Sequence, residues 1–318
     1  MDETQLIDRY FRDLGANRGD VALGIGDDAA LLRVPPGVEL VLTTDALIEG
    51  AHFLPGAPAN SLGHRALAIN LSDIAAMGAD PAWALLSLNM PAVDESWLRD
   101  FVTGFGALAA RHNVALVGGN LGRGPLSITV ELAGLVPTGH ALRRDRARPG
   151  DWLYVSGSVG DAAQGLLQPV VTADGSSDAR YLRQRLEYPT PRVELGEALR
   201  EIASACIDVS DGLYVDAQRL LRASGCGAQL QIEQLPLSDP LRRSAGEEAW
   251  RTALSGGEDY ELCFSAAPEF KDHIDELAPK TGQPISCIGR LRRESGITLK
   301  SGNSVMQFSP SGWDHFRD

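Results

Sequence analysis

The stretch Asn70-Leu71-Ser72-Asp73-Ile74-Ala75-Ala76-Met77-Gly78-Ala79 places two polar side chains inside an otherwise apolar run. We predict a helix over 61–77, with a serine cap at its start and a glycine immediately after its end. Asn70 and Asp73 are three residues apart and therefore share one face of this helix. Because their neighbours are apolar, a polar site on this face is favoured, although a solvated Asp73 is the ordinary alternative.

Four other short acidic segments lie at the edges of apolar runs, where strands or helices begin or end. They are Gly26-Asp27-Asp28-Ala29, Thr43-Thr44-Asp45, Asp208-Val209-Ser210-Asp211-Gly212 and Gly256-Gly257-Glu258-Asp259. If these segments converge in the fold, cations must hold the carboxylates together. Oxygen-only ligands favour Mg²⁺ over zinc or copper. Several Mg²⁺ ions in turn suggest a highly charged phosphate substrate.

Each acidic segment also has an ordinary structural explanation. An aspartate-rich turn would account for Asp27 and Asp28, and a polar strand end would account for Asp45. Asp211 could be only the N-cap of the helix that follows it. That explanation leaves out Asp208, which follows an apolar residue and would be costly to bury without a partner.

Two glycine pairs precede polar residues and could bring the backbone close to a phosphate. They are Gly118-Gly119, before Asn120, and Gly256-Gly257, before Glu258. Either pair could equally be a turn. The chain has no G-x-x-x-x-G-K-[ST] sequence and no protein-kinase glycine loop, so we do not expect a P-loop or protein-kinase site.

Three further candidates are ambiguous when taken alone. His52 could be a surface or structural histidine, and the Arg143-Arg144 doublet could be solvated. Trp313 lies near the C-terminus, where an aromatic residue could dock the tail or stack on a flat ring.

Composition narrows the class of protein. The chain has 318 residues, with 29 basic and 42 acidic side chains and a net charge of −13. This balance argues against binding nucleic acid or an acidic membrane, because both need a basic surface.

Three further observations bear on the location of the protein. The four cysteines form no C-x-x-C pair, and the first residues lack a signal-peptide pattern. No apolar run is long enough for a membrane span. We therefore expect a soluble cytoplasmic protein.

Strands and helices are mixed without strict alternation, which predicts an α+β fold of two domains. The basic, irregular segment from His140 to Gly150 suggests a boundary, and we predict domains over 1–148 and 149–318. The expected strands cover 38–44, 84–90, 114–117, 127–132, 152–155, 206–209, 260–265 and 286–289, and the expected helices cover 5–14, 61–77, 97–108, 193–203 and 213–223.

Together these blocks resemble the thiamine-monophosphate kinase family, part of the aminoimidazole-ribonucleotide-synthetase superfamily. The resemblance covers nearly the whole chain, from Gly24-Ile25-Gly26-Asp27-Asp28-Ala29 to Ser255-Gly256-Gly257-Glu258-Asp259-Tyr260-Glu261-Leu262. It implies a homodimer whose N-terminal β-sheet domains pair into a barrel, with a C-terminal α/β domain. It also implies ATP-dependent phosphorylation of thiamine monophosphate to thiamine diphosphate, with several Mg²⁺ ions.

The resemblance also implies roles for individual residues. It assigns the Mg²⁺ ligands to Asp28, Thr43, Thr44, Asp45, Asp73, Asn120, Asp208 and Asp211, the nucleotide contacts to Gly119, Asn120, Arg144 and Ser210, and the thiamine phosphate contacts to His52, Glu258 and Trp313. Asn120 departs from the family, which usually has an aspartate there. Asparagine offers one oxygen but no charge, so one metal ion would be held more weakly.

Other functions remain open on the sequence alone. Another ATP-using synthetase of the superfamily is the nearest alternative. A selenophosphate synthetase needs a reactive cysteine or selenocysteine in an N-terminal glycine-rich segment, whereas the first cysteine here is Cys206. A Mg²⁺-dependent phosphohydrolase or a non-catalytic metal sensor would share the acidic segments, but the sensor would leave the glycine pairs unexplained.

Overall fold

The computed structural model describes residues 2–168 and 176–309. The chain divides into two compact units. The first comprises Met1–Ile74 and Ala79–Gly139, and the second comprises Ala75–Gly78 and His140–Asp318.

The first unit is built on a four-stranded sheet. In chain order its elements are α1 (Glu3–Tyr10), β1 (Val21–Leu23), β2 (Leu31–Leu32), β3 (Val38–Ile48), α2 (Ala59–Ala76), β4 (Asp80–Met90), α3 (Glu95–Arg111), β5 (Ala115–Arg123) and β6 (Ser127–Pro137). The strand order is β3-β6-β4-β5, with β4 and β5 parallel and the other neighbours antiparallel. β1 and β2 form a separate antiparallel pair.

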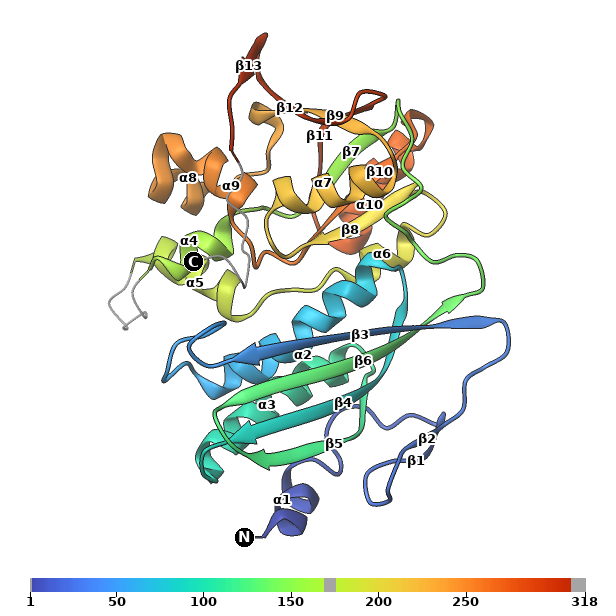
Figure 1. Cartoon of the computed structure of the whole chain (residues 1–318), viewed down its shortest axis with the longest axis vertical. Coiled ribbons are helices and arrows are strands. Elements are labelled where there is room, and N and C mark those ends of the chain that lie inside the picture. Colours follow the sequence, from blue (N-terminus) through green and yellow to red (C-terminus); the bar gives the residue numbers. More distant parts are fainter. Residues whose placement is uncertain (1, 169–175, 310–318) are drawn as a thin grey trace. The chain divides into compact units, whose positions relative to one another are not determined.

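Helices α2 and α3 cover one face of this sheet (Figure 1). Asp94 starts α3, because its carboxylate accepts the N–H groups of Ser96 and Trp97. The two helices approach closely at Gly104, where an added Cβ would lie 1.9 Å from the carbonyl oxygen of Asn60. On the other face of the sheet, apolar side chains such as Leu42 are exposed. A second, smaller core cluster of this unit includes Trp83 and Ala133, against which Val21 and Leu32 pack.

The second unit contains a seven-stranded sheet in the order β13-β12-β9-β11-β7-β10-β8. Only β9 and β12 are parallel among these neighbours. Its elements are β7 (Trp152–Ser156), α4 (Asp161–Leu166), α5 (Ser177–Glu187), α6 (Val193–Ala198), β8 (Ala205–Val209), α7 (Leu213–Ala223), β9 (Gly227–Gln231), η1 (Ile232–Gln234), α8 (Asp239–Ala245), η2 (Gly246–Glu248), α9 (Ala249–Ser255), β10 (Glu261–Ala266), η3 (Pro268–Phe270), α10 (Lys271–Thr281), β11 (Ile285–Arg292), β12 (Gly296–Ser301) and β13 (Ser304–Met306).

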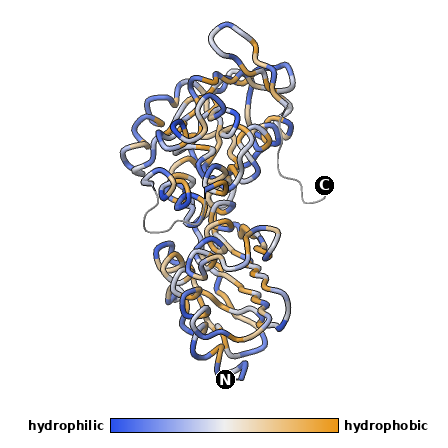
Figure 2. Tube along the Cα trace, turned by 90° about the vertical axis from the view of Figure 1, so that its left-hand side faces the viewer, coloured by the Kyte–Doolittle hydropathy of each residue, from blue (hydrophilic) through white to orange (hydrophobic). Residues whose placement is uncertain are grey.

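Apolar residues are concentrated along the strands within each unit, and hydrophilic residues along the outer turns (Figure 2). In the second unit, Tyr154 of β7 stacks on Phe264 of β10 with ring centroids 5.3 Å apart. Among the described helices, none combines the length and the apolar character needed to cross a bilayer.

The mixed sheets confirm the predicted α+β class, and α7 has the predicted bounds. Several local expectations were wrong, and the helix expected over 5–14 ends at Tyr10. β3 continues past Asp45 to Ile48, because it pairs with β6 residue by residue along its whole length. β5 continues through the first glycine pair to Arg123, so that pair is not a turn. The helix expected over 193–203 ends at Ala198.

Gly119 in β5 is explained by its backbone conformation and by its contact with β4. Gly119 has φ +149°, and a Cβ there would lie 1.9 Å from the carbonyl oxygen of Leu86. Only glycine fits this backbone and this spacing. Two consecutive glycines have a low strand propensity and would predict that the strand ends there. The pairing with β4 nevertheless extends β5 through them.

Candidate active site

In the first unit, β3 and α2 bring a hydroxyl and a carboxylate together. Thr43 Oγ1 donates a hydrogen bond of 2.5 Å to Asp73 Oδ2. Asp45 is two residues further along the same strand and therefore shares the face of Thr43. The Thr43 hydroxyl and the carboxylates of Asp45 and Asp73 therefore lie on the side of the sheet that α2 covers.

Thr44 and Asp28 are placed differently from this group. Thr44 lies on the opposite face of β3, and its hydroxyl donates to the carbonyl oxygen of Val130 at 3.2 Å. Asp28 is exposed between β1 and β2, where its N–H donates to Asp27 Oδ1 at 2.8 Å.

His52 and Asn120 are also in the first unit. His52 follows β3, and its Nδ1 accepts the N–H of Ile48 at 3.1 Å. Its carbonyl oxygen accepts a hydrogen bond from Arg65 at 3.0 Å. Both contacts fix the histidine and its loop. Asn120 is exposed on β5, beside Gly119.

In the second unit, β8 delivers the other acidic pair. Asp208 is buried within β8, and Asp211 follows the strand before α7 begins. The N-cap of α7 is Gly212, so Asp211 is not the N-cap that the alternative explanation required. Asp211 instead accepts a 2.5 Å hydrogen bond from Arg219 Nη1.

Glu258 lies beside this loop with an unusual backbone. Its φ is +71°, and Tyr260 has φ +52°, conformations that are uncommon for residues with a side chain. The N–H of Glu258 donates to the carbonyl oxygen of Ser210 at 2.8 Å, and the N–H of Tyr260 donates to that of Val209 at 2.9 Å. The two loops that carry Ser210 and Glu258 are therefore tied together.

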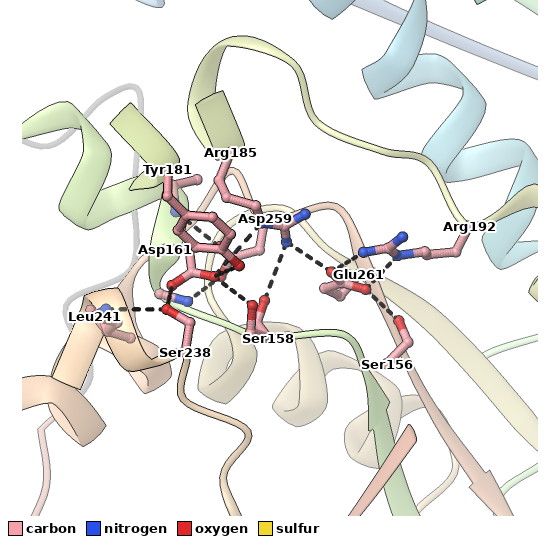
Figure 3. Close-up of polar contacts among 12 residues, drawn as sticks. Ser156, Ser158, Asp161, Tyr181, Arg185, Arg192, Ser238, Leu241, Asp259 and Glu261 are labelled. Atoms are coloured by element: carbon pink, nitrogen blue, oxygen red, sulfur yellow. Dashed lines mark hydrogen bonds and ion pairs between the residues drawn. The ribbon is translucent and has the colours of Figure 1, made fainter. Parts of the chain in front are cut away.

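A buried polar network surrounds Asp259 and Glu261, which follow Glu258 in the chain (Figure 3). Asp259 accepts the N–H groups of Gly160 and Ala162 at 2.6 and 3.2 Å. Burial raises the pKa of the Asp259 carboxyl to about 8, although Arg185 and these N–H groups oppose the rise. Asp259 is therefore largely protonated near neutral pH.

Glu261 is the most strongly paired residue of this network. Arg192 donates to both of its carboxylate oxygens at 2.6 and 2.5 Å, Arg185 donates at 2.8 Å, and Ser156 donates at 2.6 Å. Burial alone would raise the pKa of the Glu261 carboxyl, but the two guanidinium groups outweigh burial and lower it. Glu261 is therefore ionised and held in place.

The sequence reasoning missed Asp216, Arg219, Arg185 and Arg192, and it gave no role to Glu261. Asp216 and Arg219 lie on α7, close in sequence to the predicted Asp211, and an acidic residue in a first helical turn is a usable signal. Nothing local to Arg185 or Arg192 indicates that both meet Glu261, because the contacts are distant in sequence.

For two of the predicted site residues, Arg144 and Trp313, the structure gives little information about a binding role. Arg144 is exposed, and its carbonyl oxygen accepts the hydroxyl hydrogen of Ser224 at 2.7 Å. Trp313 lies outside the described residues.

The predicted metal ligands suit Mg²⁺ by their chemistry, because aspartate and threonine supply only hard oxygens. Within the residues that the structure describes, no group of three or more His, Cys, Asp or Glu side chains forms a ready-made metal cluster. The predicted ligands are divided between the two units, with Asp28, Asp45 and Asp73 in the first and Asp208 and Asp211 in the second.

Comparison with known proteins identifies the family of the chain. The model of AIR synthase related proteins matches residues 26–136 with its N-terminal domain and residues 148–301 with its C-terminal domain. Thiamine-monophosphate kinase of Salmonella typhimurium is 46% identical over 318 residues, which cover 99% of this chain and 98% of that protein.

Solved structures agree with this match. Thiamine-monophosphate kinase from Stenotrophomonas maltophilia K279a has a TM-score of 0.87 and 45% identity, covering 91% of this chain and 93% of that one. AaThiL in complex with AMPPCP and TMP has a TM-score of 0.79 and 34% identity, covering 92% of each chain. The chain thus belongs to the thiamine-monophosphate kinase family of AIR synthase related proteins.

Proposed function

We propose that the chain transfers the γ-phosphoryl group of ATP to thiamine monophosphate, forming thiamine diphosphate. The observation that carries this proposal is likeness to thiamine-monophosphate kinases along almost the whole chain. One structural relative, AaThiL, was solved with the nucleotide analogue AMPPCP together with TMP, which matches the two proposed substrates.

We propose direct in-line transfer, without a covalent enzyme intermediate. The acceptor oxygen belongs to a phosphate that is already ionised at neutral pH, so the enzyme does not need a strong general base. The main barrier is the approach of two polyanions. Mg²⁺ held by the proposed aspartates would supply positive charge that offsets this repulsion.

The proposed tasks are divided among groups of residues, and Asn120 has two of them. In the first unit, Asp45, Asp73 and the Thr43 hydroxyl present oxygens to Mg²⁺, supported by the Thr43–Asp73 hydrogen bond. In the second unit, Asp208 and Asp211 do the same. The remaining proposed contacts are Asp28, Thr44 and Asn120 to metal, Gly119, Asn120, Arg144 and Ser210 to nucleotide, and His52, Glu258 and Trp313 to thiamine phosphate.

The geometry around Gly119 and Asn120 favours a nucleotide contact. An exposed glycine and an exposed asparagine follow each other in β5, so the backbone is accessible to a phosphate. Asn120 supplies a neutral oxygen where the family usually has a carboxylate. We therefore expect weaker binding of one metal ion, which Asn120→Asp would strengthen.

The direct test is to incubate the purified protein with ATP, Mg²⁺ and thiamine monophosphate and to measure thiamine diphosphate and ADP. We expect equal amounts of both products, and no turnover when free thiamine replaces its monophosphate. Release of inorganic phosphate without thiamine diphosphate would favour a phosphohydrolase and contradict the proposal. Turnover of free thiamine but not of its monophosphate would contradict the acceptor assignment.

We further propose that two copies pair through the first-unit sheet to form a barrel. The sheet face opposite the helices exposes Leu40, Leu42 and Leu85 at 46%, 59% and 38%. An apolar face of this kind is a frequent site of association. Light scattering should give twice the 34.0 kDa chain mass, and Leu42→Glu should shift the protein toward monomer. A wild-type monomer at micromolar concentration would contradict this.

A cytoplasmic location also stays a proposal. All four cysteines are free, and Cys206, Cys226 and Cys263 are buried. Free cysteines fit a reducing compartment.

A further inference from the structure

The buried carboxylate of Asp216 accepts hydrogen bonds from three consecutive backbone N–H groups in the segment between β8 and α7. The N–H groups of Ser210, Asp211 and Gly212 all donate to Asp216 Oδ2, at 3.1, 2.9 and 3.1 Å. Asp216 lies in the first turn of α7, and its residue exposure is 1%. Three consecutive N–H groups that point at one oxygen form a tight concave turn. Asp216 therefore determines the path of this segment.

The second oxygen of the Asp216 carboxylate is linked to Asp211 through the side chain of Arg219. Arg219 Nη1 donates to Asp216 Oδ1 at 2.7 Å and to Asp211 Oδ2 at 2.5 Å. Asp211 is thus connected to Asp216 twice, through its own N–H and through the guanidinium group. Both the backbone and the side chain of Asp211 are held from one point.

We propose that Asp216 is a positioning residue, which fixes Ser210 and Asp211 for nucleotide and metal binding without touching either reactant. This inference rests on the proposed function, in which Ser210 contacts the nucleotide and Asp211 binds Mg²⁺. A purely structural role would also satisfy these three N–H groups before α7, because buried backbone donors need acceptors. The two roles differ in what a substitution changes.

The backbone contacts can be tested without any reaction. Hydrogen–deuterium exchange of the unliganded protein should show slow exchange in peptides that contain 210–212, although the segment lies outside helix and strand. Asp216→Ala should accelerate exchange there roughly tenfold or more, because hydrogen bonds to a charged group are lost. Asp216→Asn, which keeps one acceptor oxygen, should lie between. Fast exchange of 210–212 in the wild type would overturn the proposal and requires no variant.

The control is Asp239→Asn, an exposed first-turn aspartate on α8 of the same unit. It should leave exchange in 210–212 and turnover unchanged. If it altered exchange in 210–212 as much as Asp216→Asn does, the effect would not be specific to Asp216 and the proposal would fail.

Kinetics separates positioning from simple stabilisation. In Asp216→Asn, the KM for ATP measured at fixed Mg²⁺ should rise and kcat should fall, while the KM for thiamine monophosphate stays within about twofold, because a small misplacement of binding groups is costly. A lower melting temperature with unchanged nucleotide KM and kcat would overturn the positioning role. If the wild type formed no thiamine diphosphate, the proposed function would fail, while the exchange result would still report on the Asp216 contacts.

Discussion

Glu261→Gln removes the negative charge at the centre of the buried network while keeping the size of the side chain. The wild-type carboxylate is fully buried and accepts hydrogen bonds from Arg185, Arg192 and Ser156. Glutamine has a single acceptor oxygen, and its amide NH₂ would face a guanidinium donor. Buried Arg192 would then lose this counter-charge, whereas partly buried Arg185 would keep its 3.7 Å ion pair with Asp161.

Breaking a buried ion pair in this way costs about 3–5 kcal/mol. For a unit of this size, each kcal/mol lowers the melting temperature by about 2–4 °C. We therefore expect Glu261→Gln to lower the melting temperature of the second unit by roughly 6–20 °C. Differential scanning calorimetry measures this transition, and circular dichroism at low temperature checks that the variant still folds.

The matched control is Asp275→Asn, which breaks the ion pair between Lys271 and Asp275 on α10. Both of these side chains are about half exposed, so the pair should contribute little to stability. The reasoning fails if Glu261→Gln melts as close to the wild type as Asp275→Asn does. It also fails if the melting temperature rises.

Three other substitutions test separate parts of the structure. Asp211→Asn should lower turnover at least about tenfold at limiting Mg²⁺, through loss of a charged ligand, with little change in melting temperature; near-normal turnover would exclude the metal role. Asp259 has a folded-state pKa of about 8, well above its unfolded value, so its contribution is complete below pH ~4 and is lost as pH rises toward 8. The unfolding free energy of the wild type should therefore fall between pH 5 and 8, by up to about 1.4 kcal/mol per pH unit relative to Asp259→Asn, and parallel pH profiles in urea denaturation would contradict this. Gly104→Ala should destabilise the first unit by about 1–3 kcal/mol, because its Cβ would collide with Asn60, whereas Gly19→Ala has open space and should have little effect; equal denaturation midpoints would contradict the packing argument.

Some helices with a local apolar period could be predicted from the sequence, whereas α5 and α10 were not predicted. The bounds of α7 agree because its apolar spacing and its preceding glycine are both local signals. The end of β3 could not be predicted locally, because the length of this strand depends on β6, which is about 90 residues away in the chain. The extra residues Ala46 to Ile48 are strand only because residues 127–129 pair with them.

The residues of the candidate site also differ in how far the sequence could predict them. Short acidic segments could be found from local sequence, and in the first unit the structure brings the predicted residues Thr43 and Asp73 together. Asp216 and Glu261 could not be assigned a role, because a buried charge can be interpreted only once its partners are known. Arg192 is 69 residues from Glu261, and no local pattern connects them.

The positive side chains around the second-unit site are largely committed to carboxylates of the chain itself. Arg185 and Arg192 bond to Glu261, and Arg219 bonds to Asp211. Two phosphate-bearing reactants add further negative charge to a chain whose net charge is −13. Two unit charges 4 Å apart repel by about 4 kcal/mol at an effective dielectric constant of 20. Because these arginines are already paired, the compensating charge is better supplied by cations bound to the aspartates, which is the physical reason for assigning those aspartates to Mg²⁺.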